Sequence, residues 1–193
     1  MVRKLSLFVL AGVLVAAASA SAQAPPEAGS VDLGDFARKA AIGGMTEVEL
    51  GRLAVERASN ARVKEFGQRM VNDHTRADTE LRVAAREQGI PLPAELDAEH
   101  KAAVNKLSRL SGSAFDQAYM RDMVMDHEED VAEFARAAQS PGDSPVKSFA
   151  AKNLPTLQDH LKMARDVDGE LGRSSGGGAE GMVFLPRWAS ARA

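Results

Sequence analysis

The sequence predicts an all-α protein: a bundle of four long helices with an extra short helix in the connection between the second and the third. Apolar residues recur at helical spacing in four long segments, and no run of four or more residues alternates convincingly as in a strand. Residues 90–112 are long enough to cross the length of a bundle, with a short helix at about 94–110. The composition, 45% hydrophobic without cysteine, excludes collagen-like, disulfide-stapled and wholly disordered chains.

The first two long helices form a predicted hairpin. The first covers about residues 32–58, and the second begins after Asn60, a residue whose side chain caps helix N-termini well, and ends at Gly89. Glycine costs about 1 kcal/mol relative to alanine inside a helix. We therefore expect Gly43-Gly44 to mark a close helix approach or a kink. The helical pattern then ends at Ile90-Pro91-Leu92-Pro93.

The last two long helices form the second predicted hairpin. Ser113 with Asp116 makes a capping-box-like start for a helix that runs to Ala138. Ser144-Pro145 supplies an N-cap and a first helical residue for the last helix, in which Pro155 should cause a kink. Two antiparallel hairpins joined by one long crossover are a ferritin-like arrangement.

The first 22 residues predict a signal peptide. Arg3-Lys4 precedes an apolar run from Leu5 to Ala18, and Ala20-Ser21-Ala22 has the small-x-small pattern of a cleavage site, so we expect cleavage after Ala22. The run is shorter than the roughly 20 residues of a membrane span. We therefore expect no stable membrane insertion after cleavage and a periplasmic or secreted protein. An uncleaved anchor is the alternative.

The segments around the bundle have a different composition. Residues 23–31 are rich in Pro, Ala, Gly and Ser and predict a flexible lead-in, the domain covers 32–171, and 172–193 predict a disordered Gly/Ser-rich tail. The tail could instead dock on an envelope protein partner. Loss of Arg3-Lys4 with the signal peptide makes the net charge more negative than the −3 of the whole chain, which argues against nucleic acid as a partner.

Four polar residues interrupt the apolar stripes, one on each long helix. At 1.5 Å per residue, each lies roughly 18–22 Å from the turn of its hairpin, so all four should share one level and face one another. Imidazole and carboxylate ligands suit Zn, Cu, Fe, Mn or Ni, and three imidazoles with one carboxylate suffice for a single ion. The layer therefore predicts a metal site. Its residues are Glu47, His74, His127 and His160.

A purely structural layer is the alternative to a metal site. In that case Glu47 would pair with one protonated histidine and the layer would set the helix register. Neighbouring carboxylates are candidates for orienting the imidazoles, since an Asp before a histidine points about 100° away and reaches an adjacent helix more easily than its own. These carboxylates are Asp73, Asp78, Asp126, Asp130 and Asp159.

Met70, Met123 and Met163 lie one turn from the histidines of the layer, with Met120 and Met125 nearby. Together with imidazole, thioether ligands would favour copper, whereas methionines without a ligand role would fill gaps in the core. The remaining histidine, His100, is off the common level and is expected at the surface.

Several motifs occur in a fixed order along the chain. They are Ala40–Gly51 (AAIGGMTEVELG), Val63–Phe66 (VKEF), Met70–His74 (MVNDH), Met123–His127 (MVMDH) and Leu154–Leu157 (LPTL) followed by His160-Leu161. Over about residues 32–168 the chain resembles the bacterial exported family known as domain of unknown function 4142, a ferritin-like group. This resemblance implies the helical bundle and a location in the cell envelope, and it implies no particular activity.

The motifs argue against most enzyme classes. The ferritin-like resemblance suggests di-iron chemistry, which uses Glu-x-x-His on two helices. The sequence contains no Glu-x-x-His, and Met-Val-x-Asp-His occurs instead, ending at His74 and at His127. A cysteine nucleophile and a His-Glu-x-x-His motif are also absent. We expect a metal-binding envelope protein without enzymatic activity, or with metal-dependent redox activity if it has one. The alternative is a structural or interaction module of the envelope.

Overall fold

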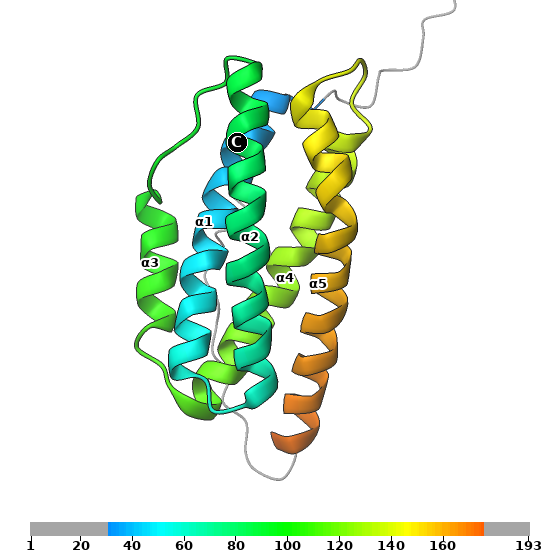
Figure 1. Cartoon of the computed structure of the whole chain (residues 1–193). Helices are drawn as coiled ribbons and strands as arrows, with labels where there is room; N and C mark the ends of the chain where they lie inside the picture. Colours follow the sequence, from blue (N-terminus) through cyan, green and yellow to red (C-terminus); the bar gives the residue numbers. More distant parts are fainter. Residues whose placement is uncertain (1–30, 176–193) are drawn as a thin grey trace, which may run out of the picture.

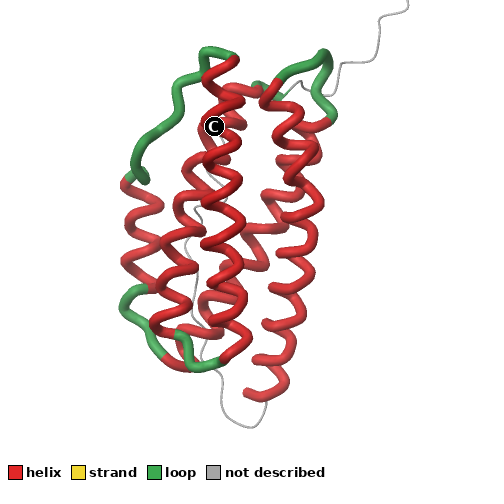
Figure 2. The backbone as a smooth tube through the Cα atoms, viewed as in Figure 1, coloured by secondary structure: helices red, strands yellow, loops and turns green. Residues whose placement is uncertain are grey.

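The computed structural model describes residues 31–175, and in this range it contains five helices and no strand. Figures 1 and 2 show a bundle of parallel and antiparallel helices, which confirms the predicted all-α class. The predicted signal peptide, most of the predicted lead-in and residues 176–193 lie outside the described residues. The helices are α1 (Leu33–Arg57), α2 (Ala61–Glu87), α3 (Ala98–Leu107), α4 (Gly112–Ala138) and α5 (Pro145–Ser175).

The four long helices form two antiparallel hairpins, α1 with α2 and α4 with α5. Helix α2 also packs on α5, and α1 packs on α4, so each long helix has two neighbours around a common core. The crossover that contains α3 returns along the outside of α1 to the other end of the bundle (Figure 1), as the sequence predicts. None of the described helices combines the length and the apolar composition that a membrane span requires.

Side-chain caps define most helix starts. The Asn60 side chain accepts from the backbone N–H of Arg62 at 2.8 Å, and Ser144 Oγ accepts from the N–H of Lys147 at 3.1 Å, which confirms both predicted caps. Helix α3 is shorter than the predicted 94–110, because Asp97 caps it through the N–H of His100 at 2.9 Å and the helix then ends at Leu107.

Two predictions about the second hairpin are wrong. Helix α4 starts at Gly112, one residue before Ser113, so there is no capping box at that position; Asp116 bonds the turn between α1 and α2 instead. Helix α5 runs to Ser175, so residues 172–175 are helical rather than part of the tail. Pro155 lies inside this helix, and the kink expected there stays a prediction. Contacts of α5 with α4 and α2 stabilise this helix beyond what its local sequence indicates.

The expected close helix approach is also not at Gly43-Gly44. A Cβ atom added to Gly43 would meet nothing within 4 Å, and one at Gly44 would lie 3.8 Å from Nδ1 of His74. Helices α1 and α2 approach closely at Gly51 and Gly67 instead, where an added Cβ would lie 2.6 Å from the Gly67 carbonyl oxygen or from the Cβ of Ala54. Backbones can come so near only where side chains are absent.

Two hydrophobic clusters fill the bundle, one toward each end. The polar layer separates them, because Met70 and Met123 of the first cluster lie one turn before His74 and His127, and Leu81 and Phe134 of the second lie about two turns after them. The layer is therefore enclosed between apolar side chains. The large members of the first cluster are Phe66, Met70, Phe115, Tyr119, Met120 and Met123, and those of the second are Phe36, Leu81, Phe134, Phe149 and Leu157.

Candidate metal centre

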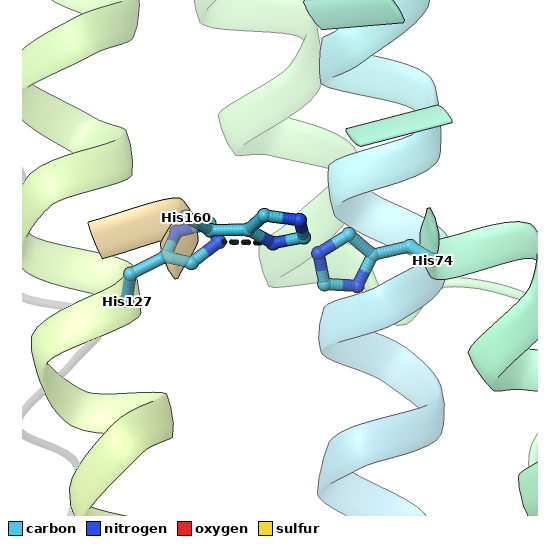
Figure 3. Close-up of side chains that lie close together, drawn as sticks. All are labelled: His74, His127 and His160. Carbon is cyan, nitrogen blue, oxygen red and sulfur yellow. Dashed lines mark hydrogen bonds between the residues drawn. The ribbon is translucent and has the colours of Figure 1, made fainter. Parts of the chain in front are cut away.

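The four residues of the predicted layer meet in the middle of the bundle. Oε2 of Glu47 lies 2.9 Å from Nδ1 of His74, and Oε1 lies 3.3 Å from Nε2 of His127. That same nitrogen lies 3.3 Å from Nδ1 of His160. Figure 3 shows the three imidazole rings pointing toward one another from α2, α4 and α5. All four side chains are buried, His74 being the most exposed at 6%.

A backbone carbonyl holds the ring of His127. Its Nδ1 lies 2.9 Å from the carbonyl oxygen of Met123, one turn earlier on α4. A carbonyl oxygen only accepts, so Nδ1 must carry the hydrogen and donate it. In the neutral ring Nε2 then presents its lone pair to the centre of the layer. Phe66 packs edge-on against this ring, with centroids 6.2 Å apart, and excludes water from that side.

A carboxylate on the adjacent helix holds the ring of His160. Nε2 of His160 donates to Oδ2 of Asp73 on α2 at 2.9 Å. Although burial raises the pKa of Asp73, the hydrogen bond from His160 and the charges of Arg76 and Arg69 lower it below its usual range. Asp73 is therefore an anion that fixes the tautomer of His160, and the ring turns Nδ1 inward. The sequence predicts such an arrangement, with an aspartate orienting the imidazole of a neighbouring helix.

Glu47 and His74 complete the layer without regular hydrogen bonds. Both oxygens of Glu47 and Nε2 of His74 are buried and have no hydrogen-bond partner, although Oε2 lies within 2.9 Å of Nδ1 of His74. Burial on its own would raise the pKa of Glu47, but the three imidazoles outweigh it and lower the pKa to about 2. The layer thus contains a buried carboxylate that is ionised at neutral pH.

The imidazoles themselves are poor carriers of a compensating charge. Burial lowers the pKa of His160 to about 4, against the opposite effect of its hydrogen bond to Asp73. Burial also lowers the pKa of His127, although the charge of Glu47 acts in the other direction. Both shifts favour the neutral ring, which leaves a lone pair on the inner nitrogen of His127 and of His160.

The spacing of these atoms fits a transition-metal ion. Nitrogen and oxygen ligands about 2.0–2.1 Å from a tetrahedral ion lie about 3.3 Å from one another. The two separations that involve Nε2 of His127, to Glu47 and to His160, are both 3.3 Å. One ligand nitrogen from each of the three histidines also falls within 4.8 Å of the other two. The three histidines can therefore share one ion, while Glu47 shares a set of ligand atoms with His127 rather than with all three rings.

The other predicted carboxylates separate into three groups. Asp126 lies with Glu47 and His127 in a second set of ligand atoms within 4.8 Å, and burial followed by the charge of Glu47 raises its pKa well above the usual range. Asp78 and Asp130 line a cavity beside the layer. Asp159 is exposed, so the prediction that it could orient an imidazole is wrong; its position on α5 faces away from the core.

The structure also places the methionines and His100. Met70, Met120 and Met123 belong to the hydrophobic cluster on one side of the layer, whereas Met125 is 44% exposed. Met163 is partly buried against the same cluster. His100 is partly exposed at the start of α3, where its Nδ1 lies 2.7 Å from Asp97.

One polar side chain beside the layer was missed because it lies on the apolar stripe of its helix. Tyr119 is fully buried on α4, and its hydroxyl has no hydrogen-bond partner. Burial, followed by the charges of Glu47 and Asp126, raises the pKa of Tyr119 well above its usual range. Its hydroxyl is therefore a neutral group near the carboxylates. The sequence does contain a signal for this residue, because Tyr119 lies two turns before His127 on the same, inward face of the helix.

The chain is similar to solved structures in its fold, although no curated protein matches its sequence. A DUF305 protein from Streptomyces coelicolor, described as secreted, has a TM-score of 0.60 and 15% identity, covering 71% of this chain and 91% of that chain. A DUF305 fragment from Deinococcus radiodurans gives a TM-score of 0.61 and 18% identity, covering 75% of this chain and 98% of that chain. At these identities the likeness shows the shared helical bundle alone. The model of DUF4142, a domain of unknown function, matches residues 18–167, and the chain belongs to this family.

Proposed function

We propose that this protein is an exported metal-binding protein whose mid-bundle centre holds one transition-metal ion. Glu47, His74, His127 and His160 supply the ligands, and their donor types suit Zn, Cu, Fe or Mn. The observation that carries the proposal is the pair of inner nitrogens on His127 and His160, which lie 3.3 Å apart while the outer nitrogens donate to Met123 and Asp73. Two neutral acceptors that face each other at that distance favour a positive charge between them, either a proton or a metal ion.

A metal ion accounts for the layer better than protons do. One proton on His74 would compensate the charge of Glu47, yet it would leave the nitrogens of His127 and His160 facing each other. A second proton would have to reside on His127 or His160. Burial lowers the pKa of both rings, that of His160 to about 4. A single divalent ion supplies both positive charges and accepts every lone pair in the layer.

The test is elemental analysis of the full-length protein, produced with its own leader and purified without chelator from the envelope fraction. We expect about one equivalent of metal in the wild type, or after reconstitution with Zn, Cu, Fe or Mn. His127→Ala should lose it, because this ring contributes the central nitrogen. His100→Ala is the matched control, since His100 lies outside the layer, and it should keep the metal. Equal metal content in both variants, or none in the wild type after reconstitution, would reject the proposal in favour of a structural layer.

Export rests on the pattern of residues 1–22. Charged residues, an apolar run and a small-x-small site occur in the order that secretory signal peptides require. The intact mass of the envelope-purified protein should correspond to residues 23–193. A mass of the uncleaved chain in the membrane fraction would support an anchor instead. The secreted description of the Streptomyces coelicolor neighbour agrees with export.

A further inference from the structure

A small cavity lies against one face of the polar layer. Its volume is about 30 Å³, and all four long helices contribute to its walls. Glu47, His74 and His160 line it at the layer, and Leu157 follows one turn away on α5. Leu81, Phe134 and Phe149, which lie two to three turns from the histidines of their helices, line its far part together with the amide of Asn153. A water-sized molecule needs roughly 10–15 Å³ by this measure. The cavity therefore has room for one molecule of two or three heavy atoms.

The opposite face of the layer is closed. Met70 and Met123 are buried one turn before His74 and His127, and Tyr119 of the same cluster is fully buried. Tight packing of this kind leaves no space for another molecule. A ligand can approach the layer from the cavity side.

Gly44 and Asp78 connect the cavity to the surface. A groove of about 460 Å³ follows the outer face of α1 and the start of the crossover, and these two residues line both the groove and the cavity. A Cβ atom at Gly44 would lie only 3.8 Å from Nδ1 of His74. Because Gly44 has no side chain, the space between the outer groove and His74 is left open at this position.

We propose that this cavity binds an uncharged molecule of two or three heavy atoms, in a position next to the metal ion. The inference rests on the proposed function for the ion, while the cavity and its ligand can be tested without metal. The carboxylates of Glu47, Asp73 and Asp78 on the walls repel anions. The side chains of Leu81, Phe134 and Phe149 in the far part offer no ligand to a hydrated cation, and the amide nitrogen of Asn153 beside them donates to the carbonyl oxygen of Phe149. A small, uncharged, weakly hydrated molecule such as dioxygen fits both ends.

Dioxygen is the probe for the test, because it is paramagnetic and increases the relaxation of nearby methyl protons. The full-length metal-free protein, labelled at leucine methyls, is measured by NMR under oxygen and under nitrogen. Leu81 and Leu157, exposed by 1% and 4%, line the cavity; Leu50 and Leu107, exposed by 3% and 2%, lie in the other cluster. We expect a several-fold larger enhancement at the first pair. Equal enhancement at the two pairs would overturn the proposal.

Two glycine variants test whether the probe enters the cavity beside Gly44. Gly44→Val should reduce the enhancement at Leu81 and Leu157 to the level of Leu50, since it fills the cavity entrance. Gly172→Val is the matched control, a helical glycine on α5 with open space around it, and it should leave the enhancement unchanged. An unreduced enhancement in a folded Gly44→Val protein would overturn the proposal. If that variant does not fold, the comparison within the wild type decides.

Metal loading separates this inference from the proposed function. The enhancement at Leu81 and Leu157 should persist after loading with diamagnetic Zn²⁺, because the ion occupies the ligand atoms rather than the cavity. Loss of the enhancement on loading would show that the ion fills the cavity and would overturn the inference. Failure of the protein to take up any metal would instead reject the proposed function, with the oxygen result still readable.

Discussion

His127 and His160 face each other across the centre of the bundle with Nε2 and Nδ1 3.3 Å apart. Each ring is fixed from outside, His127 by the carbonyl of Met123 and His160 by the carboxylate of Asp73. Rings fixed in this way lose little conformational freedom on binding an ion, which favours affinity. The outer partners therefore decide how well the inner nitrogens can serve as ligands.

Replacement of one such partner tests this relationship. Asp73→Asn removes the anion that accepts from Nε2 of His160, and loss of such a partner lowers metal affinity by about 10–100-fold. Asp159→Asn is the matched control, because Asp159 also precedes a histidine of the layer but is exposed. Competition of both variants with a chromophoric chelator for Zn²⁺ measures the affinities. Equal affinities in the two variants would contradict an orienting role for Asp73.

The half-buried carboxyl group of Asp122 on α4 makes the free energy of unfolding depend on pH. Burial raises the pKa of Asp122 from 3.8 to about 6, and the charges of Lys106 and Arg121 only partly oppose this. Such a group favours the folded state below pH 3.8, where it is neutral in both states, and this contribution is lost as the pH rises through about 6. Asp122→Asn should therefore increase the free energy of unfolding by about 1 kcal/mol at pH 7.5.

The measurement is urea unfolding of the wild type and Asp122→Asn at several pH values. The difference between the two proteins should be largest above pH 6 and should disappear near pH 4, where Asp122 itself becomes neutral. The acidic measurement thus serves as the internal control. A difference that is constant over this range would mean that the substitution acts through packing rather than through the charge.

The level of the polar layer could be predicted from the sequence, whereas its supporting contacts could not. Helical rise and short turns determine how far Glu47 and His74 lie from the end of their hairpin, so their meeting follows from counting residues. Asp73 and Asp159 look equivalent by the same counting, since each precedes a histidine. The packing of α2 on α5 brings Asp73 within 2.9 Å of His160, while Asp159 points to solvent.

The roles of the glycines in α1 and α2 also could not be predicted from the sequence. A glycine pair inside a helix attracts notice in a sequence, yet Gly43-Gly44 lines a cavity and Gly51 and Gly67 make the close contact between α1 and α2. Helix propensity treats all these glycines alike. Which of them meets a neighbouring backbone depends on the crossing point of two helices, and that point is a tertiary property.

The close contact predicts opposite effects for two Gly→Ala substitutions. A Cβ at Gly51 would lie 2.6 Å from the Gly67 carbonyl oxygen, a backbone atom that cannot move without separating the helices. Overpacking of this kind costs about 1–3 kcal/mol or more. Gly172→Ala, in an exposed helical position with nothing within 4 Å, should stabilise by up to about 1 kcal/mol. Urea unfolding compares them, and a neutral Gly51→Ala would show that the helices can separate easily.

The turn between α1 and α2 depends on a carboxylate from α4. Asp116 is 1% exposed, and its oxygens accept from the backbone N–H groups of Ser59 and Asn60, both at 3.0 Å, and from the Ser59 hydroxyl. Asp116→Ala would remove these hydrogen bonds to a buried carboxylate, although water can replace part of the lost acceptor because Ser59 is exposed and Asn60 is half-buried. A hydrogen bond to a charged group contributes about 1.5–3 kcal/mol, so we expect Asp116→Ala to lower the free energy of unfolding by roughly 1–3 kcal/mol.

Two further variants identify the cause of that loss. Asp116→Asn keeps one acceptor oxygen and should fall between Asp116→Ala and the wild type. Asp35→Ala removes an exposed aspartate paired with Arg38 and should change stability by no more than about 0.5 kcal/mol. Urea unfolding of the three proteins gives the order. If Asp116→Asn proves as unstable as Asp116→Ala, the charge of Asp116 rather than its hydrogen bonds holds the first hairpin to α4.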